Sequence, residues 1–415
     1  MTRDNLLVAI ILTLGIVVIF TAQFLTPTLY DADGYLHIRM AEFLRDLGPR
    51  YDFHWARYST FSSNFADKDF LYHLFLIPFT SFKNIFFGVK IASVVFASLL
   101  FLSFYSLLRK YSHKTILPFF LICFFLSAPF LESISSPRPM TIVILTTIIT
   151  LHLIIERQYV WVFFTGLFYA LIHITSPLII FYALAIETIR YFDKRQFYWK
   201  NALAAFFGVA AGFLFHPNFP NNFLVFYLNS ILVPLYTMKT GVLELGAEFF
   251  PLNTREYLLG YPAVIIGIIL LIYIALSKRP KPKFATQVFL ALSMFFFVLS
   301  FICRRYLSHG YLIMLLGLAA YLSDFMETKK YVHKSAMVVI LILLAMLGIN
   351  SVNNIRYNAF VARVINGHYE RIGKWMNQNI PPGELIFHAN WSDSQYFIKT
   401  PAKIHQNSRF CLTDI

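Results

Sequence analysis

The chain has 415 residues, of which 58% are hydrophobic, 18% are aromatic and only 13% are charged. This apolar content exceeds what a water-soluble domain needs to fill its core, so the composition indicates a protein that crosses a lipid bilayer several times. The net charge of +14 does not indicate nucleic-acid binding, because the cations lie in short loops between apolar segments. Cys123, Cys303 and Cys411 have neither the spacing of a zinc site nor that of a disulfide framework.

Apolar segments of membrane-spanning length recur along the chain. The first, residues 6–25, is too long for a secretory signal and lacks a small-residue cleavage pattern, so we interpret it as a retained anchor. Segment 70–108 is too long for one helix and contains Pro78, which predicts a kink or a partly interfacial element. We therefore predict an all-α polytopic membrane protein with about eleven transmembrane helices. The predicted spans are 6–25, 70–108, 115–131, 139–156, 159–174, 176–190, 200–215, 257–277, 284–302, 304–323 and 335–350.

Lysine and arginine are unevenly distributed between alternate loops. Taken together, the loops at Arg109, Arg157, Arg190, Lys278 and Lys329 hold many more of these cations than the loops that alternate with them. Because positive loops stay in the cytoplasm, we expect a plasma (inner) membrane protein with a cytoplasmic N-terminus and an extracytoplasmic C-terminus. Loop 26–69 and residues 351–415 then face outward.

Loop 26–69 combines an acidic pair with an amphipathic helix. Asp31 and Asp33 come directly after the first apolar segment, and Gly48 supplies a helix stop. Between them, alternating apolar and charged positions predict a helix lying on the membrane surface. Asp33 stands just before this helix, where its carboxylate could instead cap the backbone. The apolar positions are Leu36, Met40, Phe43, Leu44 and Leu47, and the charged ones are Arg39, Glu42, Arg45 and Asp46.

Two carboxylates one residue apart suit a hard divalent cation. Mg²⁺ and Mn²⁺ prefer oxygen ligands and often bridge to phosphate, so Asp31 and Asp33 are the predicted metal ligands. A second polar cluster contains Asp67 and Lys68 and leads directly into the next apolar segment. Lys68 is either an interfacial cation or a phosphate contact. The loop thus brings two acidic clusters and a lysine to one outward surface.

With these features the chain resembles the GT-C superfamily of membrane glycosyltransferases. The common features are the polytopic architecture, an acidic motif in the first outward loop, a following surface helix, and an acid–lysine pair before the next span. The resemblance is closest to bacterial relatives of the protein O-mannosyltransferases and the aminoarabinose transferase of lipid A. Asp31 matches the first motif of these enzymes, and Asp67-Lys68 match the second. The chain is also similar to the catalytic subunits of oligosaccharyltransferases.

The resemblance implies that a sugar moves from a polyprenyl-phosphate-linked donor to a protein, glycan or lipid acceptor outside the membrane. This inverting displacement needs a carboxylate to take the acceptor proton and cations to hold the departing phosphate. We expect Asp31 and Asp67 to be catalytic. Arg304 and Arg305 are either substrate contacts or an interfacial anchor pair. The full set of predicted substrate-binding residues is Lys68, Arg138, Arg304 and Arg305.

Other outward segments carry weaker signals. His173 and His216 lie in Pro-containing turns, where each is expected to be a loop residue more than a ligand. Segment 223–256 predicts a surface or re-entrant loop that closes on substrate.

The end of the chain changes character after the last span. Residues 369–379 predict a helix and residues 384–388 a short strand, separated by a Pro-Pro-Gly turn. We therefore divide the chain into a transmembrane domain, 1–350, and a small extracytoplasmic α/β domain, 351–415. This second domain is near the lower size limit for an independent core, so it is either minimal or truncated.

A lipid or solute transporter or flippase is an alternative function. Transporters place ionisable groups inside their spans, and Lys90 and Glu187 are the main candidates here. No internal repeat is evident, although repeats are common in transporters. A polysaccharide ligase or a membrane phosphatase would share the outward cations and is a second alternative.

Overall fold

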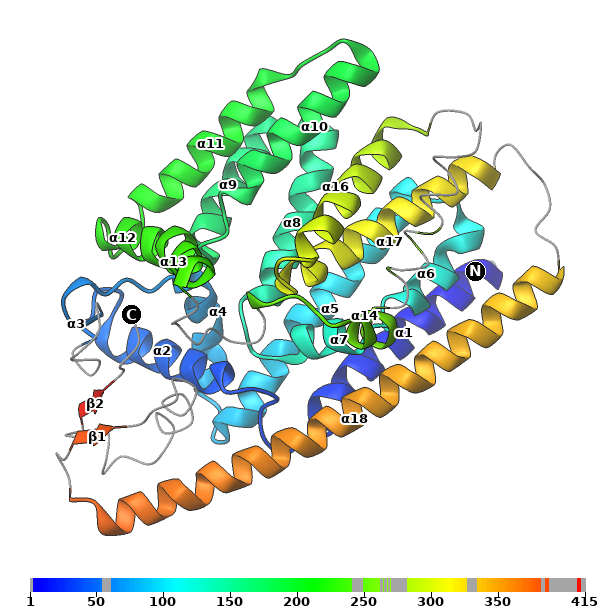
Figure 1. Ribbon diagram of the computed structural model, residues 1–415. Helices are drawn as coiled ribbons and strands as arrows, with labels where there is room; N and C mark the ends of the chain where they lie inside the picture. Colours follow the sequence, from blue (N-terminus) through cyan, green and yellow to red (C-terminus); the bar gives the residue numbers. More distant parts are fainter. Residues whose placement is uncertain are drawn as a thin grey trace.

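The computed structural model describes residues 3–53, 61–240, 249–261, 264, 267, 269, 282–326, 334–381, 385–387 and 409–411 (Figure 1). Helices dominate it, as the composition predicts. In chain order they are α1 (Arg3–Phe24), α2 (Asp33–Leu47), α3 (Phe61–Asn64), α4 (Phe70–Thr80), α5 (Ile85–Tyr111), η1 (Lys114–Ile116), α6 (Leu117–Cys123), α7 (Ala128–Ser135), α8 (Met140–Ile155), α9 (Tyr159–Ile172), α10 (Leu178–Lys194), α11 (Trp199–Leu214), α12 (Asn221–Tyr227), η2 (Leu228–Leu232), α13 (Val233–Thr240), α14 (Thr254–Gly260), α16 (Phe284–Ser300), α17 (Arg305–Met326) and α18 (Lys334–Asn379).

Three helices in the described part are long and apolar enough to cross a membrane, namely Asn5–Phe24 in α1, α5, and Arg305–Asp324 in α17. The pair α6 and α7, bent by 77°, adds a fourth if it is one span. Helices α8, α9, α11 and α16 are apolar but have at most 17 residues, so each rises roughly 21 to 26 Å. A bilayer core is about 30 Å thick. Apolar helices support a membrane protein, but eleven spans are not confirmed.

Two predicted spans are broken by local capping. Segment 70–108 forms α4 and α5, with Pro78 inside α4 and the Asn84 side chain accepting the first backbone hydrogen bond of α5. Segment 115–131 forms the bent pair α6 and α7, and the Ser127 side chain caps α7 in the same way. The prediction that segment 70–108 is too long for one helix is confirmed.

The centre of the bundle is filled with aromatic rings. Phe101, Phe104, Phe124, Phe130 and Tyr311 are fully buried, and neighbouring rings lie 4.9 to 5.5 Å apart. These rings come from α5, from the bend after α6, from α7 and from α17, so the core joins segments that are distant in sequence. Such pairs favour a fixed packing because their preferred geometries are specific.

Helix α2 packs against α4 near one end of the bundle (Figure 1). The predicted helix and its stop are confirmed, since Gly48 has φ +85° and its N–H bonds Leu44 O. The buried face differs from the predicted one, because Tyr35 and Ile38 are buried whereas Leu47 is 54% exposed. α2 therefore contacts protein on two sides: Met40 and Leu44 join Tyr51, Phe53 and Phe65, and Tyr35 and Ile38 join Leu29 and Val89.

Helix α18 is continuous over 46 residues and includes the predicted helix 369–379. It therefore crosses the predicted domain boundary at 350/351. It packs on α7, where the Asn358 amide donates to Glu132 Oε2 at 2.7 Å. Beyond it, β1 (Leu385–Phe387) pairs in parallel with β2 (Arg409–Cys411). The small α/β domain itself stays a prediction, because most residues around these strands lie outside the described part.

Polar contacts gather at opposite ends of the helices. At one end, the loop after α1 and the starts of α4, α8 and α10 meet. At the other end lie the ion pairs Lys110–Glu156 (3.0 Å) and Lys283–Asp324 (3.4 Å). The first end carries Asp31, Asp67 and Arg138.

Candidate functional site

Arg138 joins the two carboxylates of the first acidic motif. Its Nη2 lies 2.9 Å from Asp33 Oδ2, and its Nε lies 3.2 Å from Asp31 Oδ2. Arg138 belongs to the short turn between α7 and α8, whereas Asp31 follows α1 and Asp33 begins α2. The three side chains are 19 to 27% exposed, although Asp31 Oδ2 and Arg138 Nε themselves are buried. Two features predicted separately thus form one cluster, which we call the Arg138 cluster.

The capping carboxylate at the start of α2 is Asp31. Helix α2 begins at Asp33, which makes no side-chain cap, and Asp31 Oδ1 accepts a hydrogen bond from the Gly34 N–H at 3.2 Å. The expectation of a cap from Asp33 is therefore wrong. The backbone turns one step earlier than expected, and this turn orients Asp31 toward Arg138.

The second acidic motif is buried in a chain of hydrogen bonds. Asp67 Oδ2 lies 2.7 Å from His73 Nδ1, and His73 Nε2 lies 2.8 Å from His37 Nδ1. Asp67 and His73 are each 2% exposed and His37 is 7% exposed. Asp67 Oδ1 accepts the Asp69 N–H at 3.1 Å. Both oxygens of Asp67 are thus engaged inside the protein.

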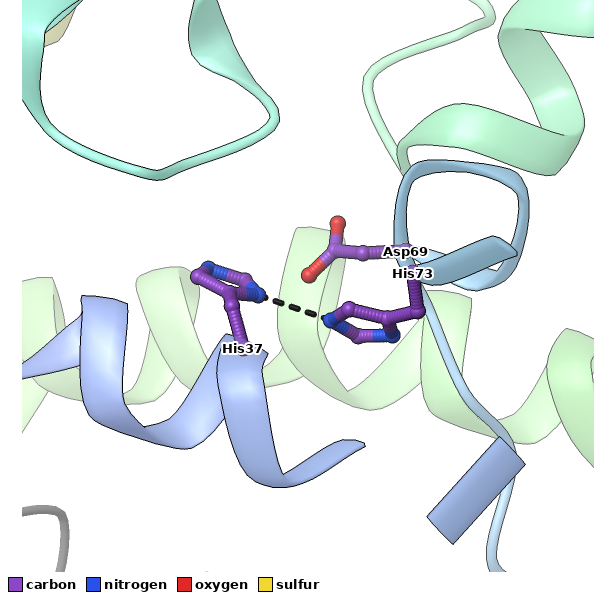
Figure 2. Close-up of side chains that lie close together, drawn as sticks. All are labelled: His37, Asp69 and His73. Atoms are coloured by element: carbon purple, nitrogen blue, oxygen red, sulfur yellow. Dashed lines mark hydrogen bonds between the residues drawn. The ribbon is translucent and has the colours of Figure 1, made fainter. Parts of the chain in front are cut away.

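Asp69 lies beside the two histidines (Figure 2). Donor atoms of His37, Asp69 and His73 all fall within 4.8 Å of one another. Burial raises the pKa of Asp69 to about 6. Burial also lowers the pKa of His37 well below its usual value, with further lowering from His73, Lys68 and Arg138.

The other predicted cations divide into two groups. Lys68 is exposed, and both Lys68 and Arg305 lower the pKa of His173 after the larger effect of its burial. Arg305 also lies over the ring of Phe249 at 4.3 Å. Arg304 instead lies 3.5 Å from Glu256 Oε2. Lys68 and Arg305 therefore both act on His173, whereas Arg304 pairs with Glu256.

The two loop histidines hold this end of the protein together. His216 Nε2 bonds the Asp67 carbonyl at 3.0 Å, and its Nδ1 accepts the Asn218 N–H at 3.1 Å. Asn218 Oδ1 in turn accepts the Asp67 N–H at 3.2 Å. His173 Nδ1 contacts Thr175 Oγ1 at 2.8 Å, and its Nε2 lies 3.9 Å from Asp69 Oδ1. The loop role expected for His216 is confirmed.

The sequence analysis did not assign a role to His37, Asp69 or His73. A usable signal exists, because His37 follows Asp33 by four residues and His73 follows Asp69 by four. On a helix such pairs share a face. The predicted loop 223–256 is helical over α12, η2 and α13, while 241–248 lies outside the described residues.

No protein-family model matches this sequence, and no curated protein is significantly similar to it. Among solved structures, the chain is similar to the apo crystal structure of the Archaeoglobus fulgidus oligosaccharyltransferase, with a TM-score of 0.60 and 13% sequence identity. The match covers 97% of this chain and 64% of that chain, so this chain spans less than two thirds of the archaeal protein. At this identity the match shows a shared fold, of the GT-C type.

Proposed function

We propose that the protein is a glycosyltransferase that moves a sugar from a polyprenyl-phosphate carrier to an acceptor on the outer face of the membrane. The observation that carries this proposal is the contact of Arg138 with Asp31 and Asp33 at one end of an apolar bundle. The fold shared with an oligosaccharyltransferase supports the same reaction class. Carboxylates and cations at a membrane interface suit a donor whose reacting bond lies beside a lipid phosphate.

Asp31 acts as the general base in this proposal. It takes the proton of the acceptor nucleophile while that atom forms a bond to the anomeric carbon of the sugar. The bond from this carbon to the phosphate oxygen breaks, and its electron pair leaves with the phosphate. Attack from the opposite face inverts the configuration through an oxocarbenium-like state.

Arg138 orients the base and binds the phosphate. Its planar guanidinium has five N–H donors, so it can contact Asp31 and Asp33 and still donate to a phosphate oxygen. Lys68 and Arg305 supply additional positive charge at the same end of the protein. Arg304, paired with Glu256, contributes less. For Asp67 we propose that it positions His73, because its carboxylate is buried and bonded.

Mg²⁺ or Mn²⁺ at Asp31 and Asp33 stays a prediction. Both carboxylates already lie within 3.2 Å of the Arg138 guanidinium, whose charge offsets theirs. A hard cation would have to displace this arginine and find further oxygen ligands. The arrangement fits an arginine-bridged pair better than a cation site, and no step proposed above depends on a metal there.

The side chains that would mark a transporter have internal partners. Glu187 accepts hydrogen bonds from Arg190 (3.0 Å), the Tyr198 N–H (3.0 Å) and Asn201 (2.8 Å). Lys90 donates to the Thr26 carbonyl. These bonds tie helices and loops together, so neither residue favours a transport pathway. A ligase would use the same cations and would differ in its acceptor.

The test is transfer by purified protein from a panel of polyprenyl-phosphate sugars, comparing Asp31→Asn with the wild type. Asn cannot accept the proton, so we expect transfer to fall by about 10²- to 10⁴-fold while the thermal midpoint stays unchanged. Asp46→Asn is the matched control, because Asp46 is exposed on α2, the helix that Asp31 precedes, and pairs with Arg45. Equal transfer by Asp31→Asn and wild type would contradict the assignment of Asp31 as the general base.

A further inference from the structure

The buried cluster beside the Arg138 cluster has the composition of a metal site. It consists of two imidazoles, from His37 on α2 and His73 on α4, and the carboxylate of Asp69 at the start of α4. Figure 2 shows the carboxylate next to the two rings, with the dashed line joining the ring nitrogens. Each side chain offers one ligand atom, and these atoms lie within 4.8 Å of one another.

We propose that His37, Asp69 and His73 bind one divalent transition-metal ion, and that Asp67 holds His73 in the binding orientation. The site is separate from the Asp31 and Asp33 pair, and the proposal does not depend on the glycosyltransferase assignment. Its ligand atoms would be His37 Nδ1, His73 Nε2 and a carboxylate oxygen of Asp69.

The first support is the hydrogen bond between Asp67 and His73. An ionised carboxylate can only accept, so the contact of Asp67 Oδ2 with His73 Nδ1 at 2.7 Å assigns the proton to Nδ1. The lone pair of Nε2 then accepts the hydrogen of His37 Nδ1. A metal ion bound by both nitrogens would take the place of this hydrogen, and His37 would then carry its proton on Nε2. Metal-binding histidines generally donate their second N–H to a carboxylate, which fixes the tautomer and the ring orientation. Asp67 has this position relative to His73.

The second support is the carboxylate of Asp69. The residue is 2% exposed, and its Oδ1 has no hydrogen-bond partner within the part of the chain that the structure describes. His173 Nε2 is 3.9 Å from this oxygen, which is beyond hydrogen-bonding distance. Buried polar atoms without a partner are rare, and a metal ion satisfies such an oxygen directly. The unpartnered atom belongs to the same three-residue set.

The donor set selects the class of metal. Imidazole nitrogens favour Zn²⁺ and other late first-row ions, whereas Mg²⁺ prefers an octahedral shell of oxygens. Three protein ligands leave one or more positions open for water or for a substrate oxygen. We therefore assign the site to Zn²⁺ or a similar ion and not to Mg²⁺.

The proposal is tested by metal content and not by activity. Full-length protein is treated with a chelator, given Zn²⁺ alone or Mg²⁺ alone, and analysed for bound metal per chain. We expect one tightly bound Zn²⁺ that Mg²⁺ does not displace. Asp69→Asn and His37→Gln should weaken Zn²⁺ binding by more than about 100-fold, and Asp67→Asn by about 10- to 100-fold.

The control variant is His152→Gln. His152 contacts Tyr111 at the opposite end of the helices, so Zn²⁺ binding should not change. If the site variants do not fold, X-ray absorption at the zinc edge of the wild type decides the matter. Two imidazole nitrogens in the shell support the site. Absence of stoichiometric Zn²⁺, an oxygen-only shell, or unchanged binding in the folded site variants overturns the proposal and leaves Asp67, His73 and His37 as a hydrogen-bonded chain.

Discussion

Arg138 contacts both carboxylates of the first acidic motif. One guanidinium contacts Asp31 and Asp33 from different nitrogens, which a lysine ammonium cannot reproduce, because it is a point charge on a flexible stem. The proposed roles of Arg138, orienting the base and binding the phosphate, therefore both depend on its planar shape.

Replacing Arg138 by lysine should reduce transfer by about 10²- to 10³-fold, because one preorganised donor to the leaving phosphate is lost. Steady-state transfer kinetics measure the effect. Arg45→Lys is the control, since Arg45 pairs with the exposed Asp46 on the surface of α2. If Arg138→Lys retained full activity, charge alone would suffice and the bidentate role would be wrong.

The sequence was most informative about charged residues in the predicted outward loops, including Asp67, which is buried in the structure. Asp31, Asp33, Lys68 and Arg138 could be singled out because charges next to apolar spans are conspicuous. The contact between Arg138 and the two aspartates depends on how α7 and α8 pack against α1 and α2. Only its spacing of four residues from Asp33 marks His37, because a histidine among apolar positions otherwise looks like an ordinary core residue.

Among the elements, α9 and α11 approach each other closely. A Cβ added to Gly208 would lie 2.2 Å from the backbone oxygen of Phe163. Because this atom belongs to a helix backbone, it cannot move aside as a flexible side chain would. Glycine thus allows two apolar helices to pack at short distance, as small residues do in membrane bundles.

Gly208→Ala should destabilise the protein by about 1–3 kcal/mol, because the added methyl forces α9 and α11 apart. Thermal unfolding in detergent measures the loss. Gly367→Ala on α18 is the matched control, since nothing lies within 4 Å of its added Cβ. This control should be neutral or stabilise by up to about 1 kcal/mol. Equal thermal midpoints for the two variants would contradict the close packing.

One element boundary was predictable because glycine marks it: Gly48 predicted the end of α2. Pro78 lies inside α4, and the break before α5 comes after Thr80. The bend between α6 and α7 was missed, because its capping residue, Ser127, is a single small polar residue in an apolar run. The continuity of α18 was missed because the sequence becomes polar after residue 350, which predicted a domain boundary there. No helix breaker accompanies this change, so the helix continues to Asn379.

At the scale of the whole molecule, polar contacts gather at two opposite ends of the helices. The positive-loop count predicts that the end with the Arg138 cluster faces outward. Exposed residues at the two ends provide a direct check, because Lys68 lies at one and Lys194 at the other.

In a variant without Cys123, Cys303 and Cys411, Lys68→Cys should react with a membrane-impermeant thiol reagent added to intact cells. Lys194→Cys should react only after the membrane is permeabilised. Mass-shift gels measure both. The reverse pattern would place the site in the cytoplasm, where the proposed acceptor reaction could not take place.

Composition predicted the helical membrane class, and the similarity to an archaeal oligosaccharyltransferase confirms the fold at the coarse level. The number of spans was not predictable from apolar length alone. Helices such as α8 and α9 have 16 and 14 residues, so sequence runs that look like full spans end before about 30 Å is crossed. Tertiary packing decides where these helices stop.

The most direct measurement of the central claim is mass spectrometry of the lipids that copurify with wild-type protein and with Asp31→Asn. A glycosyltransferase that cannot deprotonate its acceptor retains its donor. The account therefore predicts intact polyprenyl-phosphate sugar on Asp31→Asn and mainly polyprenyl phosphate, the product of sugar transfer, on the wild type. The same uncleaved lipid on both proteins, or no polyprenyl lipid on either, would contradict it.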